Sequence, residues 1–424
     1  MSRSWRKLNG FKGADAPSLA DILASPKGGV RKVYYDILTG AQDSGSEEET
    51  LILGDNAREF LVFGGQVSLR YAFTLGEFTS EVRSGLRVHV DQIERDHTED
   101  GFLMENQQLV SDGEVTVTAL RNRGRTAALA GFVHYGLFGY NLTVTPGLRF
   151  EHVATGLLDR ETSALQENSS TTLLPGLGVH YEITNGLGVL AGAYRGFSPV
   201  APGQDAEVRP ETSVNYEAGV RYVVESSNLR LEAIGFFNDY SNLVGQCSFS
   251  SGCAPDDLAK QFNGGEVDIY GLELMAGNRF ALSKGLMLDL QATYTLTHTE
   301  FQRAFSSDNP QFGDVEIGDE LPYVPAHQAS FQAGLSRASW AFDLSVVFVD
   351  SMREIAGQGP SSVSETTDSF VMVDANLRVR ATEWLELSLK GENLTMSEAI
   401  ASRRPFGARP IKPLLVSLGA SFEW

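Results

Sequence analysis

The last twelve residues of the chain, Pro413 to Trp424, alternate between apolar and small or polar side chains. The apolar stripe consists of Leu414, Val416, Leu418, Ala420, Phe422 and Trp424. A period of two residues indicates a β-strand with one apolar face. A final strand of this kind, ending on an aromatic residue, is typical of a barrel that spans a bacterial outer membrane, because its outer face contacts lipid and its rim carries aromatic side chains.

The composition agrees with a membrane barrel. The mean hydropathy is only -0.14, and the chain contains no run of about 18 apolar residues that would predict a transmembrane helix. A spanning barrel needs none, because only alternate residues of each strand face lipid. The net charge of -20 argues against nucleic acid as a partner, because nucleic acid selects a basic surface.

Segments with the same alternation recur from about residue 60 to the end of the chain. Clear examples lie at 67–73, 82–90, 286–297, 371–380 and 385–390. We count about fifteen, and several reach about ten residues, which is too many for a soluble sandwich. The predicted fold class is all-β: a transmembrane antiparallel β-barrel, present here as about 15 to 16 strands.

The connections between these segments alternate between short and long. The short ones are at 74–77, 184–186, 226–228, 283–285, 336–339 and 381–384. The long ones cover 10–58, 94–112, 154–170, 198–210, 241–264, 301–323, 351–366 and 395–411. Short turns at the periplasmic end and long loops at the extracellular end are the arrangement of outer-membrane barrels. Trp340, Trp384 and Trp424 all fall at the short-turn end, where we expect them to form one interface girdle.

Two cysteines, Cys247 and Cys253, lie in one polar long loop. Their short spacing in a Gly- and Ser-rich stretch predicts a small disulfide loop, which requires an oxidising compartment. Two unpaired loop thiols are the alternative. No third Cys and no His lies near them, so the spacing does not favour a metal site.

The segments SRSWRKLNGF (2–11) and NAREFLVFGGQVSLRYAF (56–73) look most like the ferric-citrate branch of the TonB-dependent outer-membrane receptors. Several further segments together resemble TonB-dependent receptors in general. They are PGLRFEHV (146–153), GAYRGFSPVAPG (192–203), RPETSVNYEAGVRY (209–222), EAIGFFNDYSNLV (232–244), GGEVDIYGLELMAG (264–277), ELPYVPAHQASFQAGL (320–335) and the terminal block 390–424. No single motif is very specific, but their order and spacing are. The resemblance implies a receptor for a ferric chelate such as ferric citrate or another siderophore.

The resemblance covers only the later part of such a receptor. A complete receptor has a TonB box, a plug domain and about 22 strands, so we interpret residues 1–424 as the C-terminal part of the barrel domain, with a partial strand at Ser2–Leu8. No signal peptide follows Met1, and we expect the natural N-terminus to be missing. A truncated, non-functional receptor fragment is an open alternative.

The family resemblance implies partners and candidate ligand contacts. Transport would depend on the TonB–ExbB–ExbD system through the missing part, and assembly on the barrel assembly machinery through the last strand. Ferric chelates are mostly anionic, and arginine pairs carboxylates bidentately. The candidate ligand residues are Arg403, Arg404 and Arg409 in the last long loop and Arg121, Arg123 and Arg125 beside an earlier one. Contact with lipopolysaccharide phosphates, or pairing between loops, is the alternative for Arg403 and Arg404.

The chain offers no catalytic constellation. Its seven His residues are scattered without metal-ligand spacing, and no GxSxG or GxxxxGK motif occurs. We therefore predict neither an enzyme nor a resident metal or cofactor. Inward-facing Arg378 and Arg380, near the periplasmic end, suit docking of a plug better than ligand binding. A passive porin and a soluble all-β adhesin remain the alternatives from other classes.

Overall fold

The computed structural model describes residues 1–204, 207–247, 253, 260–283, 285–404 and 408–423. Trp424 and three residues of the last long loop (405–407) therefore lie outside the described part of the chain.

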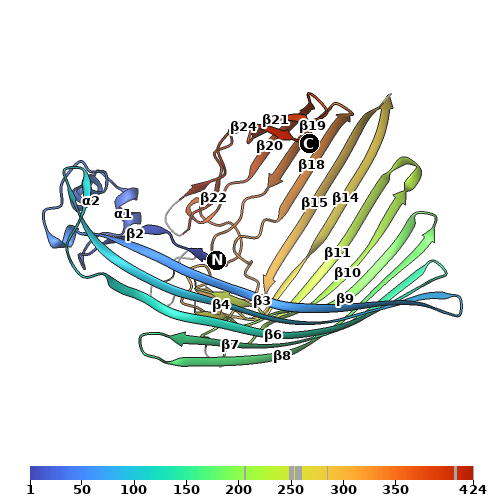
Figure 1. The fold of residues 1–424 in the computed structure, drawn as a ribbon, viewed down its shortest axis with the longest axis horizontal. Coiled ribbons are helices and arrows are strands. Elements are labelled where there is room, and N and C mark those ends of the chain that lie inside the picture. The colour runs from blue at the N-terminus through green and yellow to red at the C-terminus, as the bar shows by residue number, and fades with distance from the viewer. Residues whose placement is uncertain (205–206, 248–252, 254–259, 284, 405–407, 424) are drawn as a thin grey trace.

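One 18-stranded sheet dominates the fold. Three of its strands are short: β1 (Ser2–Arg3), β2 (Arg6–Phe11) and β5 (Gln108–Ser111). The other fifteen are β3 (Leu51–Leu75), β4 (Phe78–Glu105), β6 (Val117–Gly139), β7 (Leu142–Asp159), β8 (Leu165–Thr184), β9 (Leu187–Ser198), β10 (Glu211–Val224), β11 (Leu229–Asn242), β14 (Val267–Ser283), β15 (Leu286–Phe301), β18 (His327–Arg337), β19 (Trp340–Val349), β20 (Phe370–Arg380), β21 (Leu385–Glu392) and β24 (Leu415–Phe422). Their number agrees with the sequence prediction, and the predicted membrane β-barrel class is confirmed. Each of the fifteen pairs antiparallel with the next, and Figure 1 shows them as one strongly curved sheet.

The short connections lie where the sequence predicts them, at one end of the sheet. One was missed: β6 and β7 are joined by only Tyr140 and Asn141, both with positive φ (51° and 62°). Positive φ at both central residues is the geometry of a two-residue hairpin turn whose twist matches the strands. The central pair is Tyr-Asn and not the typical Asn-Gly, so the turn is hidden from sequence inspection.

The long connections are only partly irregular. The predicted loops at 94–112 and 154–170 are wrong, because β4, β7 and β8 continue through them and turn tightly at their tips. Beyond the lipid both faces of a strand meet water or other loops, so the ladder continues while the apolar alternation stops. The predicted loop at 10–58 is also corrected: it contains α1 (Leu19–Ala24) and α2 (Gly29–Leu38), and β3 begins within it.

The helices pack on the extracellular extension of the first strands. Ile37 of α2 is fully buried against Leu51 of β3 and Met104 of β4. Short hairpins occupy three of the remaining long loops: β12 (Val244–Gln246) with β13 (Gln261–Asn263), β16 (Phe305–Ser306) with β17 (Asp314–Val315), and β22 (Ile400–Ser402) with β23 (Arg409–Pro410). Both features give the extracellular side a structured layer of its own.

The sheet has two chemically distinct faces. We call the face with exposed apolar side chains, such as Phe342, Leu377 and Leu389, the outer face. The opposite, inner face carries charged residues such as Asp343 and Arg378. In the described part of the chain, no helix is long and apolar enough to cross a membrane.

The sheet does not close on itself among the described residues. Strand β24 pairs with β21 and with no other described strand. At the other end, β1 and β2 pair with β3 between Leu51 and Glu59. The rest of β3, from Leu61 to Leu75, has β4 as its one described neighbour, so a long stretch of this edge lacks a strand partner.

The two faces predict opposite responses to a buried charge. Leu377 lies between Phe342 and Leu389 on the outer face, so Leu377→Arg should lower the free energy of unfolding in lipid vesicles by about 2 kcal/mol. The matched inner-face change, Asn376→Arg, should leave it nearly unchanged. Urea unfolding, followed by heat-modifiable gel migration, measures both. Equal effects of the two variants would contradict this assignment of faces.

Candidate functional site

The inner face near the short-turn end forms a polar hollow of about 780 Å³. Its charged lining comes from neighbouring strands and includes Arg230, Arg279, Asp289, Asp343, Asp374, Arg378 and Lys390. Most of these charges are paired: Arg279 bonds Asp289, and Arg378 lies 3.3 Å from Asp343. Arg378 therefore faces inward as predicted, whereas a role in plug docking stays a prediction for it and for Arg380.

A second, apolar layer closes over the sheet at the long-loop end. Val267 and Phe301 are fully buried there with Val315, and the rings of Phe305 and Phe312 pack around Phe301. This cluster joins the ends of β14 and β15 to the loop that follows β15. The extracellular loops thus have a core of their own rather than extending freely into solvent.

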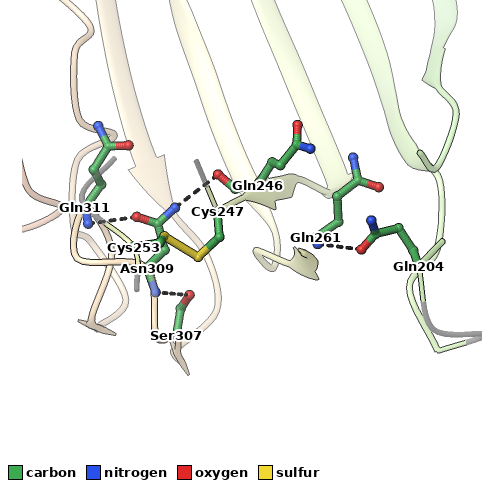
Figure 2. Close-up of a disulfide and its surroundings, with 8 residues drawn as sticks. All are labelled: Gln204, Gln246, Cys247, Cys253, Gln261, Ser307, Asn309 and Gln311. Carbon is green, nitrogen blue, oxygen red and sulfur yellow. Dashed lines mark hydrogen bonds between the residues drawn. A yellow bond between two sulfur atoms is a disulfide. The ribbon is translucent and has the colours of Figure 1, made fainter. Parts of the chain in front are cut away.

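The disulfide predicted from the sequence is present in this layer (Figure 2): Cys247 and Cys253 are joined, with their Cα atoms 5.7 Å apart. Beside it, the fully buried Asn309 donates from Nδ2 to the carbonyl oxygen of Gln246 at 3.3 Å. Gln261 accepts from the backbone of Ala201 at 2.9 Å and donates its own backbone N–H to Gln204 at 2.6 Å. These bonds tie three loops into one unit.

The arginines of the last long loop make contacts between loops. Arg403 donates from Nε to the carbonyl oxygen of Thr366 at 2.9 Å, and Arg404 donates from a terminal nitrogen to that of Pro310 at 3.4 Å. Arg409 lies exposed in β23. Arg403 and Arg404 thus hold neighbouring loops together. Pairing between loops is the role that the sequence offered for them as an alternative to ligand contact. Their contact with a ligand stays a prediction, as does that of Arg409.

The arginines of β6 lie on the other side of the sheet. Arg121, Arg123 and Arg125 share the outer face with the lipid-facing residues further along the strand. Arg123 lies 2.6 Å from Glu94, and Arg121 lies 3.5 Å from Asp96. The register therefore points these three side chains away from the interior. The ligand role predicted for them stays untested, and their position does not favour it.

The tryptophans occupy the predicted end of the sheet. Trp340 begins β19, and Trp384 precedes β21 and stacks on Phe422 with the ring centres 6.1 Å apart. The third predicted member, Trp424, lies outside the described residues. A shared role at the membrane interface stays a prediction.

A cationic cluster at the extracellular end of the inner face was missed in the sequence. Arg58 of β3 lies directly opposite Arg95 of β4, and Asn56 lies opposite His97. Arg58 donates from Nε to His97 Nε2 at 3.4 Å, and Arg95 donates to Asn122 Oδ1 at 3.2 Å. Burial, and after it the charges of Arg58, Arg95 and Lys7, lower the pKa of His97 to about 4.

The signal for this cluster was present in residues 94–100, ERDHTED, which the sequence analysis assigned to a loop. Acidic and basic residues alternate there with a period of two, which is a strand pattern in which the two faces differ in charge. The structure places Glu94 and Asp96 on the outer face and Arg95 and His97 on the inner face. Charge alternation, and not only apolar alternation, would have revealed the strand.

These sites offer charges and hydrogen-bond donors that can bind a ligand. Within the described ranges, no group of three or more His, Cys, Asp or Glu residues is placed to hold a metal ion. The inner face offers paired charges near the periplasmic end and guanidinium groups near the extracellular end. Such donors select anionic, oxygen-rich ligands.

A family model described as "TonB dependent receptor-like, beta-barrel" matches residues 21–394. Among solved structures, the chain is similar to the ferric citrate transporter FecA in its unliganded form, with 20% identity, a TM-score of 0.66, and coverage of 88% of this chain and 57% of that one. The siderophore receptor PiuA from Acinetobacter baumannii has 14% identity and a TM-score of 0.65, with coverage of 88% of this chain and 56% of that one. The ferric-catecholate import receptor Fiu from E. coli K12 has 16% identity and a TM-score of 0.61, with coverage of 88% of this chain and 55% of that one. The chain thus spans somewhat over half the length of these proteins.

The disulfide loop gives a test of the loop layer. Replacing both Cys247 and Cys253 with Ser should destabilise the segment between β12 and β13 by about 2 kcal/mol, because the crosslink closes a short loop. Limited proteolysis should then cut this segment faster, while the barrel resists. A reducing agent should reproduce the effect in the native chain and add nothing in the double variant. Equal resistance of native and variant proteins would show that the crosslink does not stabilise the layer.

Proposed function

Because the chain belongs to the TonB-dependent receptor-like β-barrel family, we propose that it forms part of the wall of a receptor that imports a ferric chelate with energy supplied through TonB. The family resides in the bacterial outer membrane, and this chain is an outer-membrane protein. Proteins of this family bind and transport rather than catalyse. Ferric citrate or another siderophore is the proposed class of ligand.

The observation that carries the proposal is the asymmetry between the two ends of the sheet. The structured loop layer, with its disulfide and aromatic core, lies only at the long-loop end. At the other end, turns as short as two residues leave the polar inner face accessible. Capture of a ligand outside the cell and its release toward the periplasm require this polarity. The similar proteins described as a ferric citrate transporter and a siderophore receptor support the ligand class.

We further propose that residues 1–424 form the C-terminal part of a larger barrel. The part of β3 from Leu61 to Leu75 and the edge of β24 have no second strand partner among the described residues. They would expose backbone hydrogen-bonding groups to lipid, which is strongly unfavourable. Additional strands and a plug from the complete protein would satisfy these edges and occupy the interior. The polar hollow around Arg378 is then a surface for the plug, and β24 is the strand that the barrel assembly machinery would bind.

The partners follow from the same proposal. TonB, with ExbB and ExbD, would act on the plug from the periplasm. Arg403, Arg404 and Arg409 remain proposed ligand contacts at the extracellular mouth, and lipopolysaccharide is the alternative partner for Arg403 and Arg404. The loop-bridging bonds of Arg403 and Arg404 imply that a bound ligand would have to share or replace them.

Uptake of radioactive iron tests the function directly. Cells that lack their own ferric-chelate receptors should take up ferric citrate, or another ferric siderophore from a panel, when this protein is expressed from its natural gene. Uptake should fall to background in a strain without TonB, because the energy for plug movement comes from TonB. Uptake that persists without TonB would instead indicate a passive porin-like channel, and no uptake of any ferric chelate would overturn the proposed ligand class.

A further inference from the structure

Three arginines lie side by side at the extracellular end of the inner face. Arg3 of β1 is directly opposite Arg58 of β3, and Arg58 is directly opposite Arg95 of β4. Like charges in directly opposed cross-strand positions repel each other. In the described part of the chain, neither Arg58 nor Arg95 forms an ion pair, and no acidic residue contributes to the pKa of either.

Elsewhere on the inner face, several arginines are paired with an acid. Arg221 is directly opposite Glu232 and bonds it, and Arg279 is directly opposite Asp289 and bonds it. Even where two arginines are opposed, as at Arg70 and Arg83, both bond one shared carboxylate, that of Glu81. The row of Arg3, Arg58 and Arg95 differs from the Arg70–Arg83 pair, because in the described part of the chain no carboxylate bridges Arg58 and Arg95.

The neighbouring row adds hydrogen-bond donors. Asn56 is only 8% exposed, and its Nδ2 is buried without a hydrogen-bond partner. Its cross-strand neighbour is His97, which accepts from Arg58. A buried donor without an acceptor is destabilising, because it has lost its bonds to water and gained none. An incoming oxygen atom would relieve both this cost and the repulsion between the guanidinium groups.

The cluster is rigidly positioned. The guanidinium carbon of Arg58 lies 4.7 Å from the centre of the Trp5 ring, and the backbone N–H of Asn56 donates to the carbonyl oxygen of Trp5 at 3.0 Å. Asn122, which accepts from Arg95, is itself 92% buried. Arginines stacked and bonded in this way lose little conformational freedom on binding, which favours affinity.

We propose that Arg58, Arg95 and Asn56 form a binding site for the carboxylate groups of an anionic ligand that enters the barrel from outside. This inference deepens the proposed function. The identity of the ligand as a polycarboxylate ferric chelate rests on that proposed function. The site faces the interior, so a soluble anion reaches it and the phosphates of membrane lipids do not. Arg58 and Arg95 occupy directly opposed cross-strand positions, and guanidinium groups bind carboxylate oxygens through charge-assisted hydrogen bonds.

Binding of citrate, ferric citrate and inorganic phosphate to the purified protein in detergent tests the site. Calorimetry should show that Arg58→Gln and Arg95→Gln each weaken citrate and ferric citrate binding about 10- to 100-fold, because each removes a charge-assisted hydrogen bond. Arg221→Gln is the matched control: it removes an inner-face arginine that is already paired with Glu232, outside the proposed site, and should leave binding unchanged. Heat-modifiable gel migration verifies that each variant is folded, and Arg58→Lys and Arg95→Lys replace any Gln variant that is not.

The outcomes separate the two proposals. Ferric citrate binding that is unchanged in folded Arg58 and Arg95 variants overturns the site and leaves the receptor function standing. Citrate binding that depends on both arginines, without any binding or uptake of ferric chelates, supports the site and overturns the proposed function. Phosphate binding as tight as citrate binding would overturn the assignment to carboxylates.

His97 provides an independent, pH-dependent readout. It is surrounded by Lys7 of β2, by Arg58 of β3 and by Arg95, Asp96 and Glu99 of β4. Burial and the neighbouring cations hold the pKa of its imidazole at about 4 in the free protein. A bound carboxylate favours the imidazolium form, so saturating citrate should raise the pKa of His97 toward its ordinary value of 6.5.

The sign of the linkage follows. Between pH 4 and pH 6.5, His97 would be protonated in the citrate complex but not in the free protein. The affinity for the citrate trianion should therefore increase as the pH falls from 6.5 toward 4. His97→Gln should abolish that increase. Nuclear magnetic resonance of the imidazole, resolved among seven His residues, measures the pKa with and without citrate. A pKa of His97 that does not move at saturating citrate would contradict a ligand at this site.

Discussion

The whole structure depends on one constraint: in a lipid bilayer, every backbone N–H and C=O must find its partner within the protein. Between strands β3 and β24 this requirement produces an unbroken series of antiparallel neighbours. The alternation of side chains then separates a lipid-facing surface from a polar interior. Among the described strands, the part of β3 from Leu61 to Leu75 and the outer edge of β24 have a free side, and the proposed additional strands would satisfy the same constraint there.

The ladder also builds the structure that lies outside the membrane. Strands β3 and β4 run well past the lipid, where β3 pairs with β1 and β2 and both strands contact α2. Residues from three distant parts of the chain, near positions 3, 58 and 95, become neighbours there. A loop would bring them together only transiently. The extended sheet fixes them on one face, which is what a pre-organised binding site requires.

The sequence predicted the membrane-spanning part well because lipid imposes a strict pattern on it. The alternation in segments such as 371–380 and Gly in turns such as 283–285 follow directly from that environment. Outside the membrane the pattern weakens, so the extensions of β4, β7 and β8 were assigned to loops. The bonds from Arg403 to Thr366 and from Arg404 to Pro310 were beyond prediction, because they join loops far apart in sequence.

Arg123 and Arg95 lie on opposite faces of the sheet. Because successive residues of a strand alternate between the faces, a shift of one position decides whether an arginine can line an interior site. Arg123 is an odd-numbered residue of β6, like lipid-facing Leu129 and Val133, and so it lies outside with an acidic partner at 2.6 Å. Arg95 points inward, opposite another arginine and without an acid. On the same face, Arg70 and Arg83 are opposed in the same way but share the carboxylate of Glu81. Local rules are broken where function requires it, and an anion held between Arg58 and Arg95 is the simplest compensation for two opposed positive charges beside a buried, unsatisfied amide.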